Sequence, residues 1–135
     1  GGLVDAYRCE QAELIIVIMG SFAGMARDVV DSMRSKGLKA GLLRLRAFRP
    51  FPNEAVRNYL SSARNVIVID RDFSYGNEGA VCTEIRAALC NLSSPPYILN
   101  FIGGLGGADI TAEEIESLAE RFMRETGNIG NPRDS

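Results

Sequence analysis

The stretch Leu42–Pro52, LLRLRAFRPFP, combines the pattern of a buried strand with fixed positive charge. Its apolar start is typical of a strand, and Leu43 and Leu45 then alternate with Arg44 and Arg46. The stretch ends in an aromatic turn bracketed by prolines. Because charged side chains are rarely buried without a partner, this strand is predicted to meet something outside the local core at one end or on one face.

Four other segments are also predicted to be strands. Leu3–Arg8 alternates in polarity, which is typical of a half-exposed edge strand, whereas the β-rich run Glu13–Met19 suits a strand covered on both faces of a parallel sheet. The predicted strands are Leu3–Arg8, Glu13–Met19, Lys39–Arg46, Asn65–Asp70 and Tyr97–Ile102.

Helical patterns follow four of these strands. Ser21 and Asn53 are placed as helix caps, and Thr111 with Glu114 forms a capping box. Strands that alternate with helices at short spacing predict an α/β fold, a three-layer α/β/α sandwich with a mostly parallel sheet. We expect one domain over residues 1–127 and a polar, disordered tail over 128–135. The predicted helices are Phe22–Lys36, a short one from the Asn53 cap to Leu60, Glu78–Cys90, and one from Thr111 to Gly127.

Composition excludes several classes of function. A net charge of −2 and a pI near 5.2 argue against nucleic acid as a partner, and the longest apolar run is too short to cross a membrane. No leader pattern opens the chain, so a cytoplasmic location is expected. The sequence has no His and only three Cys, without C-x-x-C spacing, which argues against a Ser-His-Asp triad, a zinc site or an iron–sulfur cluster. We expect the cysteines to be packed, free thiols.

Two glycine-rich loops follow predicted strands, where open α/β sheets bind anions and nucleotides. Neither completes a nucleotide fingerprint, so we favour tight turns or an interface and keep an anion site as the alternative. Asp70, Arg71 and Asp72 lie at the carboxyl end of a strand, and we interpret them as solvated ion pairs. The candidate anion-site residues are Gly20, Ser21, Gly103, Gly104, Gly106 and Gly107.

The candidate interface residues are Arg44, Arg46, Arg49 and Phe51. Guanidinium groups suit carboxylates, phosphates and acidic side chains across an interface, and Arg and aromatic anchors are enriched at interface hot spots. The alternatives are pairing with acids of this same chain and a small-molecule site. Because prolines make the turn rigid, we favour an interface.

Four segments together resemble domain II of pyruvate:ferredoxin oxidoreductases and related 2-oxoacid:ferredoxin oxidoreductases, which is the C-terminal part of the alpha subunit in split enzymes. These are GLVDAYRCEQAELIIVIMGS, GLLRLRAFRPFP, VIDRDFSYGNEGAVCTEIRAAL and FIGGLGGADIT. The resemblance implies a fold similar to the transketolase C-terminal domain. Its sheet has five strands in the order 1-3-2-4-5, with the first strand antiparallel.

The resemblance also implies a function for the whole enzyme, which cleaves pyruvate with thiamine diphosphate, passes electrons through iron–sulfur clusters to ferredoxin and forms acetyl-CoA. The chain carries neither the thiamine diphosphate–magnesium motif nor a cluster-binding cysteine set. We therefore expect no catalytic, cofactor-binding or metal-binding residue in this domain. Its expected role is to brace the other domains and subunits, with ferredoxin and CoA met through the whole complex.

Two other hypotheses remain open from the sequence. The first is a free-standing nucleotide- or anion-binding α/β module that uses the glycine loops. The second is a purely structural dimerisation domain.

Overall fold

The computed structural model describes residues 3–19, 23–46, 48–70, 79–103 and 111–127. In this part of the chain, strands and helices alternate after an initial pair of strands. The strands are β1 (Val4–Tyr7), β2 (Leu14–Met19), β3 (Ala40–Leu45), β4 (Asn65–Asp70) and β5 (Tyr97–Ile102). The helices are α1 (Ala23–Ser35), α2 (Asn53–Leu60), α3 (Ala80–Leu89) and α4 (Ala112–Glu125).

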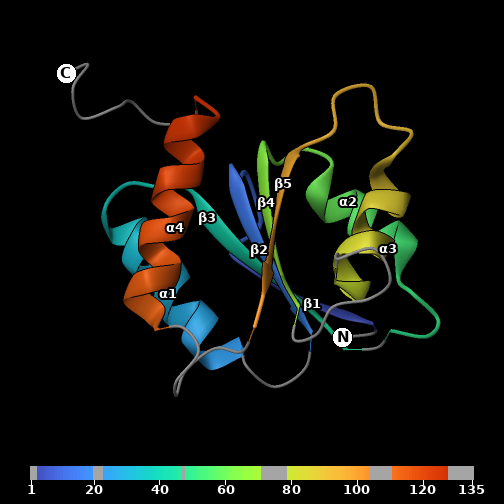
Figure 1. The fold of residues 1–135 in the computed structure, drawn as a ribbon, viewed down its shortest axis with the longest axis horizontal. Coiled ribbons are helices and arrows are strands. Elements are labelled where there is room, and N and C mark those ends of the chain that lie inside the picture. Colours follow the sequence, from blue (N-terminus) through green and yellow to red (C-terminus); the bar gives the residue numbers. More distant parts are fainter. Residues whose placement is uncertain (1–2, 20–22, 47, 71–78, 104–110, 128–135) are drawn as a thin grey trace.

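The five strands form one sheet in the order β1-β3-β2-β4-β5. β1 pairs antiparallel with β3, and the other neighbouring strands pair in parallel. The order and the antiparallel edge strand expected from the resemblance are therefore confirmed. Helices cover both faces of this sheet, α1 and α4 on one and α2 and α3 on the other (Figure 1).

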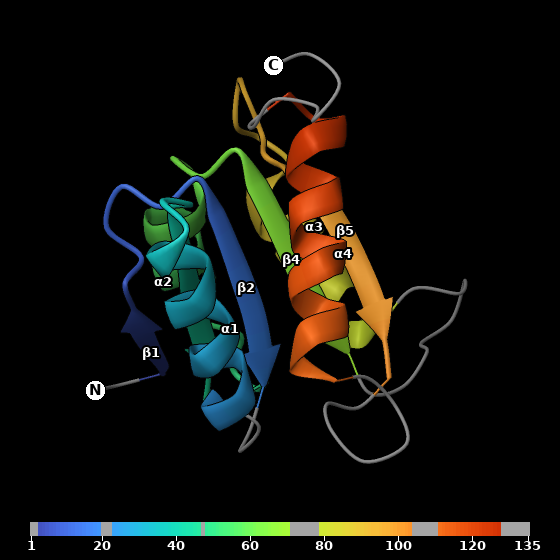
Figure 2. The same cartoon turned by 90° about the vertical axis from the view of Figure 1, so that its left-hand side faces the viewer.

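The core consists of one apolar layer on each side of the sheet. β2 and β4 lie in the middle, and β4 is buried along its whole length because helices cover both of its faces. β3 contributes to both layers, since Leu42 belongs to the cluster under α1 and α4, and Leu43 and Leu45 belong to the cluster under α2 and α3. Figure 2 shows the sheet behind α1 and α4, with β1 at one edge and β5 at the other.

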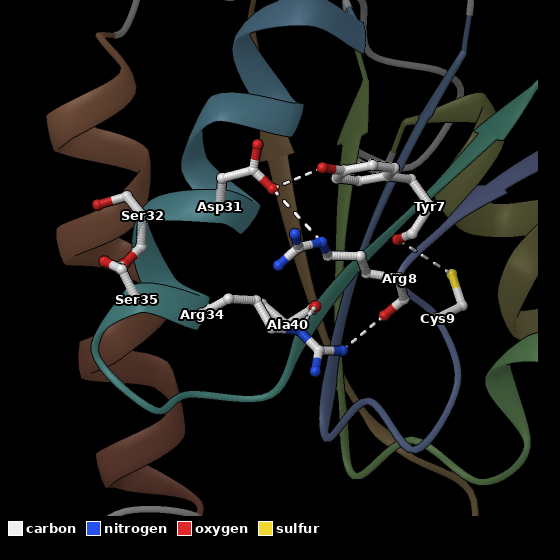
Figure 3. A network of polar contacts seen from close by, with 8 residues as sticks. All are labelled: Tyr7, Arg8, Cys9, Asp31, Ser32, Arg34, Ser35 and Ala40. Atoms are coloured by element: carbon white, nitrogen blue, oxygen red, sulfur yellow. Dashed lines mark hydrogen bonds and ion pairs between the residues drawn. The ribbon is translucent and has the colours of Figure 1, made fainter.

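Side chains of α1 fix the outer strand β1 (Figure 3). The Tyr7 hydroxyl donates a 2.6 Å hydrogen bond to the Asp31 carboxylate, which raises the pKa of Tyr7. Arg34 donates from Nη2 to the Arg8 carbonyl at 2.7 Å and from Nε to the Ala40 carbonyl at 2.8 Å. One helix side chain therefore ties the end of β1 to the start of β3.

The turn after β1 packs directly on β3, and this explains a glycine inside that strand. A Cβ atom at Gly41 would lie 2.6 Å from the Arg8 carbonyl oxygen and 2.9 Å from the Cα of Cys9. The buried Cys9 thiol donates to the Leu42 carbonyl at 3.2 Å, and burial raises its pKa. The turn and β3 are thus in backbone contact, which only glycine permits at this position.

Element boundaries differ from the predictions by one or two residues, with one change of role. Asn53 does not cap α2, because Pro52 is the N-cap, Asn53 is the first helical residue, and no side chain caps that end. The capping box of α4 is confirmed, with Thr111 and Glu114 bonded reciprocally at 3.1 Å. All three cysteines are free, but Cys90 is exposed, so the expectation that it is packed is wrong. Ser21 and the expected tail, 128–135, lie outside the described residues.

Candidate functional site

The carboxyl ends of β2, β3, β4 and β5 lie on the same side of the sheet, at the ends of the strands, because these strands are parallel. Of the six candidate anion-site residues, Gly103 is described, and Gly20, Ser21, Gly104, Gly106 and Gly107 lie outside the described residues. Gly103 has a φ of +144°, and its amide donates to the Asp70 carbonyl at 2.7 Å. That amide extends the hydrogen-bond ladder between β4 and β5, so it is not available to bind an anion. The prediction of an anion site therefore rests on the other five residues.

Asp70 closes the amino end of α3. Its side chain is 5% exposed and accepts hydrogen bonds from the Val81 amide at 2.8 Å and the Cys82 amide at 3.1 Å. These amides belong to the first turn of α3, where helical backbone N–H groups lack partners within the helix. The interpretation of Asp70 as part of a solvated ion-pair cluster is therefore wrong. Its proposed companions, residues 71 and 72, lie outside the described residues.

Asn100 on β5 completes this closure. Its Nδ2 donates to Asp70 and to the Val68 carbonyl, both at 3.0 Å, and its Oδ1 accepts from the Gly79 amide at 3.0 Å. A Cβ atom at Gly79 would lie 2.1 Å from the Asp70 carboxyl group. The end of β4, the middle of β5 and the start of α3 are thereby joined, and the chain's own carboxylate fills the place where a helix start would bind an anion.

Sequence reasoning missed the roles of Asp70 and Asn100, and a local signal was available for Asp70 alone. An Asp that ends a buried strand, followed after a loop by a glycine and a helix, fits a carboxylate that caps that helix. No comparable local signal marks Asn100, because it meets Asp70 only through the pairing of β4 with β5.

Arg44 and Arg46 converge on Asp5 of β1. Arg44 donates to the Asp5 carboxylate from Nε at 3.2 Å and also from Nη2, and Arg46 Nε lies 2.8 Å from the same oxygen. These bonds, first from Arg44 and then from Arg46, lower the pKa of Asp5 to about 2. The alternative of pairing with the chain's own acid thus holds for both arginines, while Arg46 remains 48% exposed at its side chain.

Arg49 and the two phenylalanines form a second part of this surface. The Arg49 guanidinium lies 4.3 Å from the centre of the Phe48 ring, and Phe48 meets Phe51 edge to face at 6.1 Å. Nη1 of Arg49 is 3.5 Å from the Glu84 carboxylate on α3. Both rings pack against the core, whereas the Arg49 side chain is 71% exposed. The turn is anchored by its aromatic rings and presents its cation outward.

An open groove of about 740 Å³ runs between the start of β1 and α2, next to this turn. Leu3 and Tyr59 line it and are 41% and 38% exposed, two of the large apolar side chains that the described residues leave in solvent. Phe51 and Pro52 form its wall toward the turn. We call the exposed residues Arg46, Arg49, Leu3 and Tyr59, together with Phe51, the arginine surface.

The described residues contain neither a metal-binding cluster nor a membrane-spanning helix. Within those ranges, no three side chains of the His, Cys, Asp and Glu types gather to hold a metal. None of the helices described is both long and apolar enough to span a bilayer.

Residues 12–115 match the family pyruvate:ferredoxin oxidoreductase core domain II. The chain belongs to this family. Curated relatives include the pyruvate synthase subunits PorA of Methanosarcina barkeri, 41% identical over 92% of the chain, and of Methanothermobacter thermautotrophicus, 43% identical over 89%. The ketoisovalerate oxidoreductase subunit VorA of Pyrococcus furiosus is 36% identical over 94%. Domain II spans about a third of the length of these relatives, 31%, 30% and 33% respectively.

Two solved structures share the fold of domain II. The alpha chain of a probable 2-oxoacid ferredoxin oxidoreductase from Thermoplasma acidophilum is 30% identical with a TM-score of 0.53, and the alignment covers 92% of this chain and 99% of that one. The 2-oxoglutarate:ferredoxin oxidoreductase from Magnetococcus marinus is 24% identical with a TM-score of 0.62, covering 82% of this chain and 18% of that one. The second comparison supports the fold alone.

Proposed function

We propose that this chain is domain II of the alpha subunit of a pyruvate:ferredoxin oxidoreductase and serves as a non-catalytic assembly domain. The observation that carries the proposal is the family match over residues 12–115, together with relatives in which the same domain fills about a third of a subunit. The whole enzyme would oxidatively decarboxylate pyruvate to acetyl-CoA and reduce ferredoxin. Its other domains and subunits would be the direct partners of this chain.

Pyruvate is the substrate we favour for the whole enzyme. The pyruvate synthase subunits reach 43% identity, whereas PorA and VorA of Pyrococcus furiosus are both 36% identical. Substrate contacts would lie in other domains. The proposed cytoplasmic location and the likeness to the transketolase C-terminal domain rest on sequence reasoning.

Cofactor chemistry would belong to the rest of the complex, which by family resemblance uses thiamine diphosphate, magnesium and iron–sulfur clusters. The cysteines of this chain and the acids that the structure describes do not fit an iron–sulfur cluster or magnesium. Three cysteines are fewer than the four thiolates of a common cluster, and Cys9 and Cys82 are buried. Both oxygens of Asp70, the buried acid among the described residues, already accept hydrogen bonds from α3 and Asn100.

The arginine surface is the proposed contact with those other domains. The Arg49–Glu84 pair is long, at 3.5 Å, and largely exposed, so it contributes little and can be exchanged for an acid on a partner. Exposed Leu3 and Tyr59 beside it supply the apolar area that an interface needs around a cation. These features support an interface role for Arg46, Arg49 and Phe51, whereas Arg44 is bound to Asp5 and lies outside the arginine surface.

The proposal is tested by placing Arg49→Glu in the complete alpha subunit and measuring co-purification with its partner subunits. We expect weakened assembly, because the substitution puts a carboxylate where a partner acid would lie. Lys39→Glu is the matched control, since it makes the same charge change on an exposed residue at the opposite end of β3. Equal assembly of both variants would remove the arginine surface from the proposal.

The non-catalytic role has a separate test on the 135-residue chain. Calorimetric titration with thiamine diphosphate and Mg²⁺ should give no heat of binding, and micromolar binding would contradict the role. A thermal-shift screen against phosphate, nucleotides and CoA addresses the alternative of an anion-binding module. That alternative predicts ligand stabilisation, whereas the assembly domain predicts none.

A further inference from the structure

The two edges of the sheet differ in length and composition. β1 has four residues and carries the Asp5–arginine cluster. β5 has six residues, YILNFI, none of them charged, and every one is at least partly exposed. Tyr97 at its start is 54% exposed. Long, apolar edge strands without charges or prolines are templates for pairing with another strand, and soluble proteins normally protect them.

The backbone of β5 turns half of its hydrogen-bonding groups outward. The Tyr97 amide donates to the Arg64 carbonyl at 2.8 Å, and the Gly103 amide donates to the Asp70 carbonyl at 2.7 Å. In a parallel pair, alternate residues face the neighbouring strand, so Ile98, Asn100 and Ile102 direct their N–H and C=O groups away from β4. Among the described residues, no strand pairs with this outer side.

A groove of about 440 Å³ beside this edge separates β5 from α4. Phe101 forms its floor on the strand, and Leu118 contributes apolar surface from the helix. Acids lie toward the start of α4, at Glu113 and Glu114, and Arg121 lies toward its end. Figure 2 shows α4 in front of the sheet near β5, running opposite to that strand. The side of α4 next to the open edge is therefore acidic at one end and basic at the other.

This arrangement is self-complementary. If two copies pair β5 antiparallel about a two-fold axis at Asn100, Ile98 of one copy faces Ile102 of the other, and all three outward residues find partners. Phe101, the neighbour of Asn100, lines the same groove as Glu113 and Arg121, which places the axis between these two positions of α4. The same axis then sets Glu113 of one α4 toward Arg121 of the other.

We propose that β5 and the adjoining side of α4 form a homodimer interface, in which a second copy of this chain extends the sheet across β5. This goes beyond the assembly role proposed above, which uses the opposite edge of the sheet. Backbone hydrogen bonds would provide affinity, as in strand addition generally, and the Glu113–Arg121 pairs would select the antiparallel orientation.

Sedimentation velocity of the 135-residue chain over a wide concentration range tests this inference. The solved Thermoplasma acidophilum chain has nearly the same extent, which makes the chain a natural unit to study. We expect a reversible monomer–dimer equilibrium. Arg121→Glu should raise the dimer dissociation constant at least tenfold by placing acid against acid, and Glu113→Arg combined with Arg121→Glu should restore dimerisation. Lys39→Glu, on an exposed residue away from this edge, should leave the equilibrium unchanged.

Ile98→Pro tests the strand contact separately. It removes an outward N–H without touching the ladder to β4, and should give a folded monomer by circular dichroism. If this variant fails to fold, Arg121→Glu and its rescue by Glu113→Arg still test the dimer interface. A wild-type chain that stays monomeric at its solubility limit would overturn the proposal, as would a dimer that Arg121→Glu leaves unaffected.

Discussion

Two carboxylates, Asp5 and Asp70, show two ways of holding a negative charge in this small sheet. Asp5 is bound by the flexible side chains of Arg44 and Arg46, and its own side chain is 26% exposed. Asp70 is 5% exposed and is bound by two backbone amides of α3 and the Asn100 side chain. The same residue type is therefore part of an adjustable surface in one place and of a fixed junction in the other.

The difference indicates which of the two sites can exchange its partner for a group on another protein. Arg46, 48% exposed at its side chain, can rotate toward another acid at little cost, because exposed ion pairs contribute little to stability. The donors around Asp70 are backbone groups set by the helix and the strand pairing, and they cannot turn away without unfolding that junction. This contrast supports the Asp5 side as the contact surface and the Asp70 side as structure.

The largest expected effect is that of Asp70→Ala. It leaves two helix amides and the Asn100 amide group without their acceptor in a buried place, which should lower the free energy of unfolding by about 2–4 kcal/mol. Urea denaturation at neutral pH measures this change. Asp5→Ala is the matched control and should cost clearly less, because water replaces the lost partner. Equal losses of unfolding free energy in the two variants would contradict the contrast between the buried Asp70 and the more exposed Asp5.

Gly79→Ala should have the next largest effect. Its Cβ atom would lie 2.1 Å from the Asp70 carboxyl group, which is held in place by three hydrogen bonds. Displacing that group should cost about 1–3 kcal/mol. Gly24→Ala is the control, since nothing lies within 4 Å of a Cβ atom there and it is inside α1. Because Gly24 lies in the first turn of α1, the substitution should stabilise the chain by at most roughly 0.5 kcal/mol, through helix propensity.

A smaller effect is expected from Asp5 as the pH falls. Its pKa is lowered to about 2 in the folded chain, so it contributes stability above its unfolded value of 3.8, and this is lost as the pH falls from about 4 through 2. The unfolding temperatures of the wild type and of Asp5→Asn, measured across this pH range, give the loss. The unfolding temperature of the variant should depend less on pH, and equal pH dependence in both proteins would contradict the lowered pKa of Asp5.

The smallest effect separates the two arginines of the Asp5 cluster. The hydrogen bond from Arg44 is the largest cause of the lowered pKa of Asp5, and that from Arg46 comes second. Arg44→Ala should therefore raise the pKa of Asp5 more than Arg46→Ala, as followed by NMR titration of the Asp5 carboxyl carbon. The reverse order would mean that the more exposed Arg46 holds the charge.

Much of the architecture could be predicted before any coordinates. Apolar periodicity located the five strands and four helices to within a residue or two, because burial of one face or two leaves a local pattern in the sequence. The capping box at Thr111 and Glu114 was equally local. The strand order was available through the resemblance to domain II, since periodicity alone does not say which strands are neighbours.

The partners of the charged residues needed the tertiary structure. Asp70 meets α3 amides 11 and 12 positions away and Asn100 30 positions away, and Asp5 meets Arg44 39 positions away. The strand, loop, glycine and helix around Asp70 fit a capping carboxylate, but the local sequence does not show that Asn100 completes the junction. The segment Leu42–Pro52 showed that its arginines needed a partner outside their own strand. The antiparallel pairing of β1 with β3 supplied that partner for Arg44 and Arg46, because it places Asp5 directly opposite Arg44.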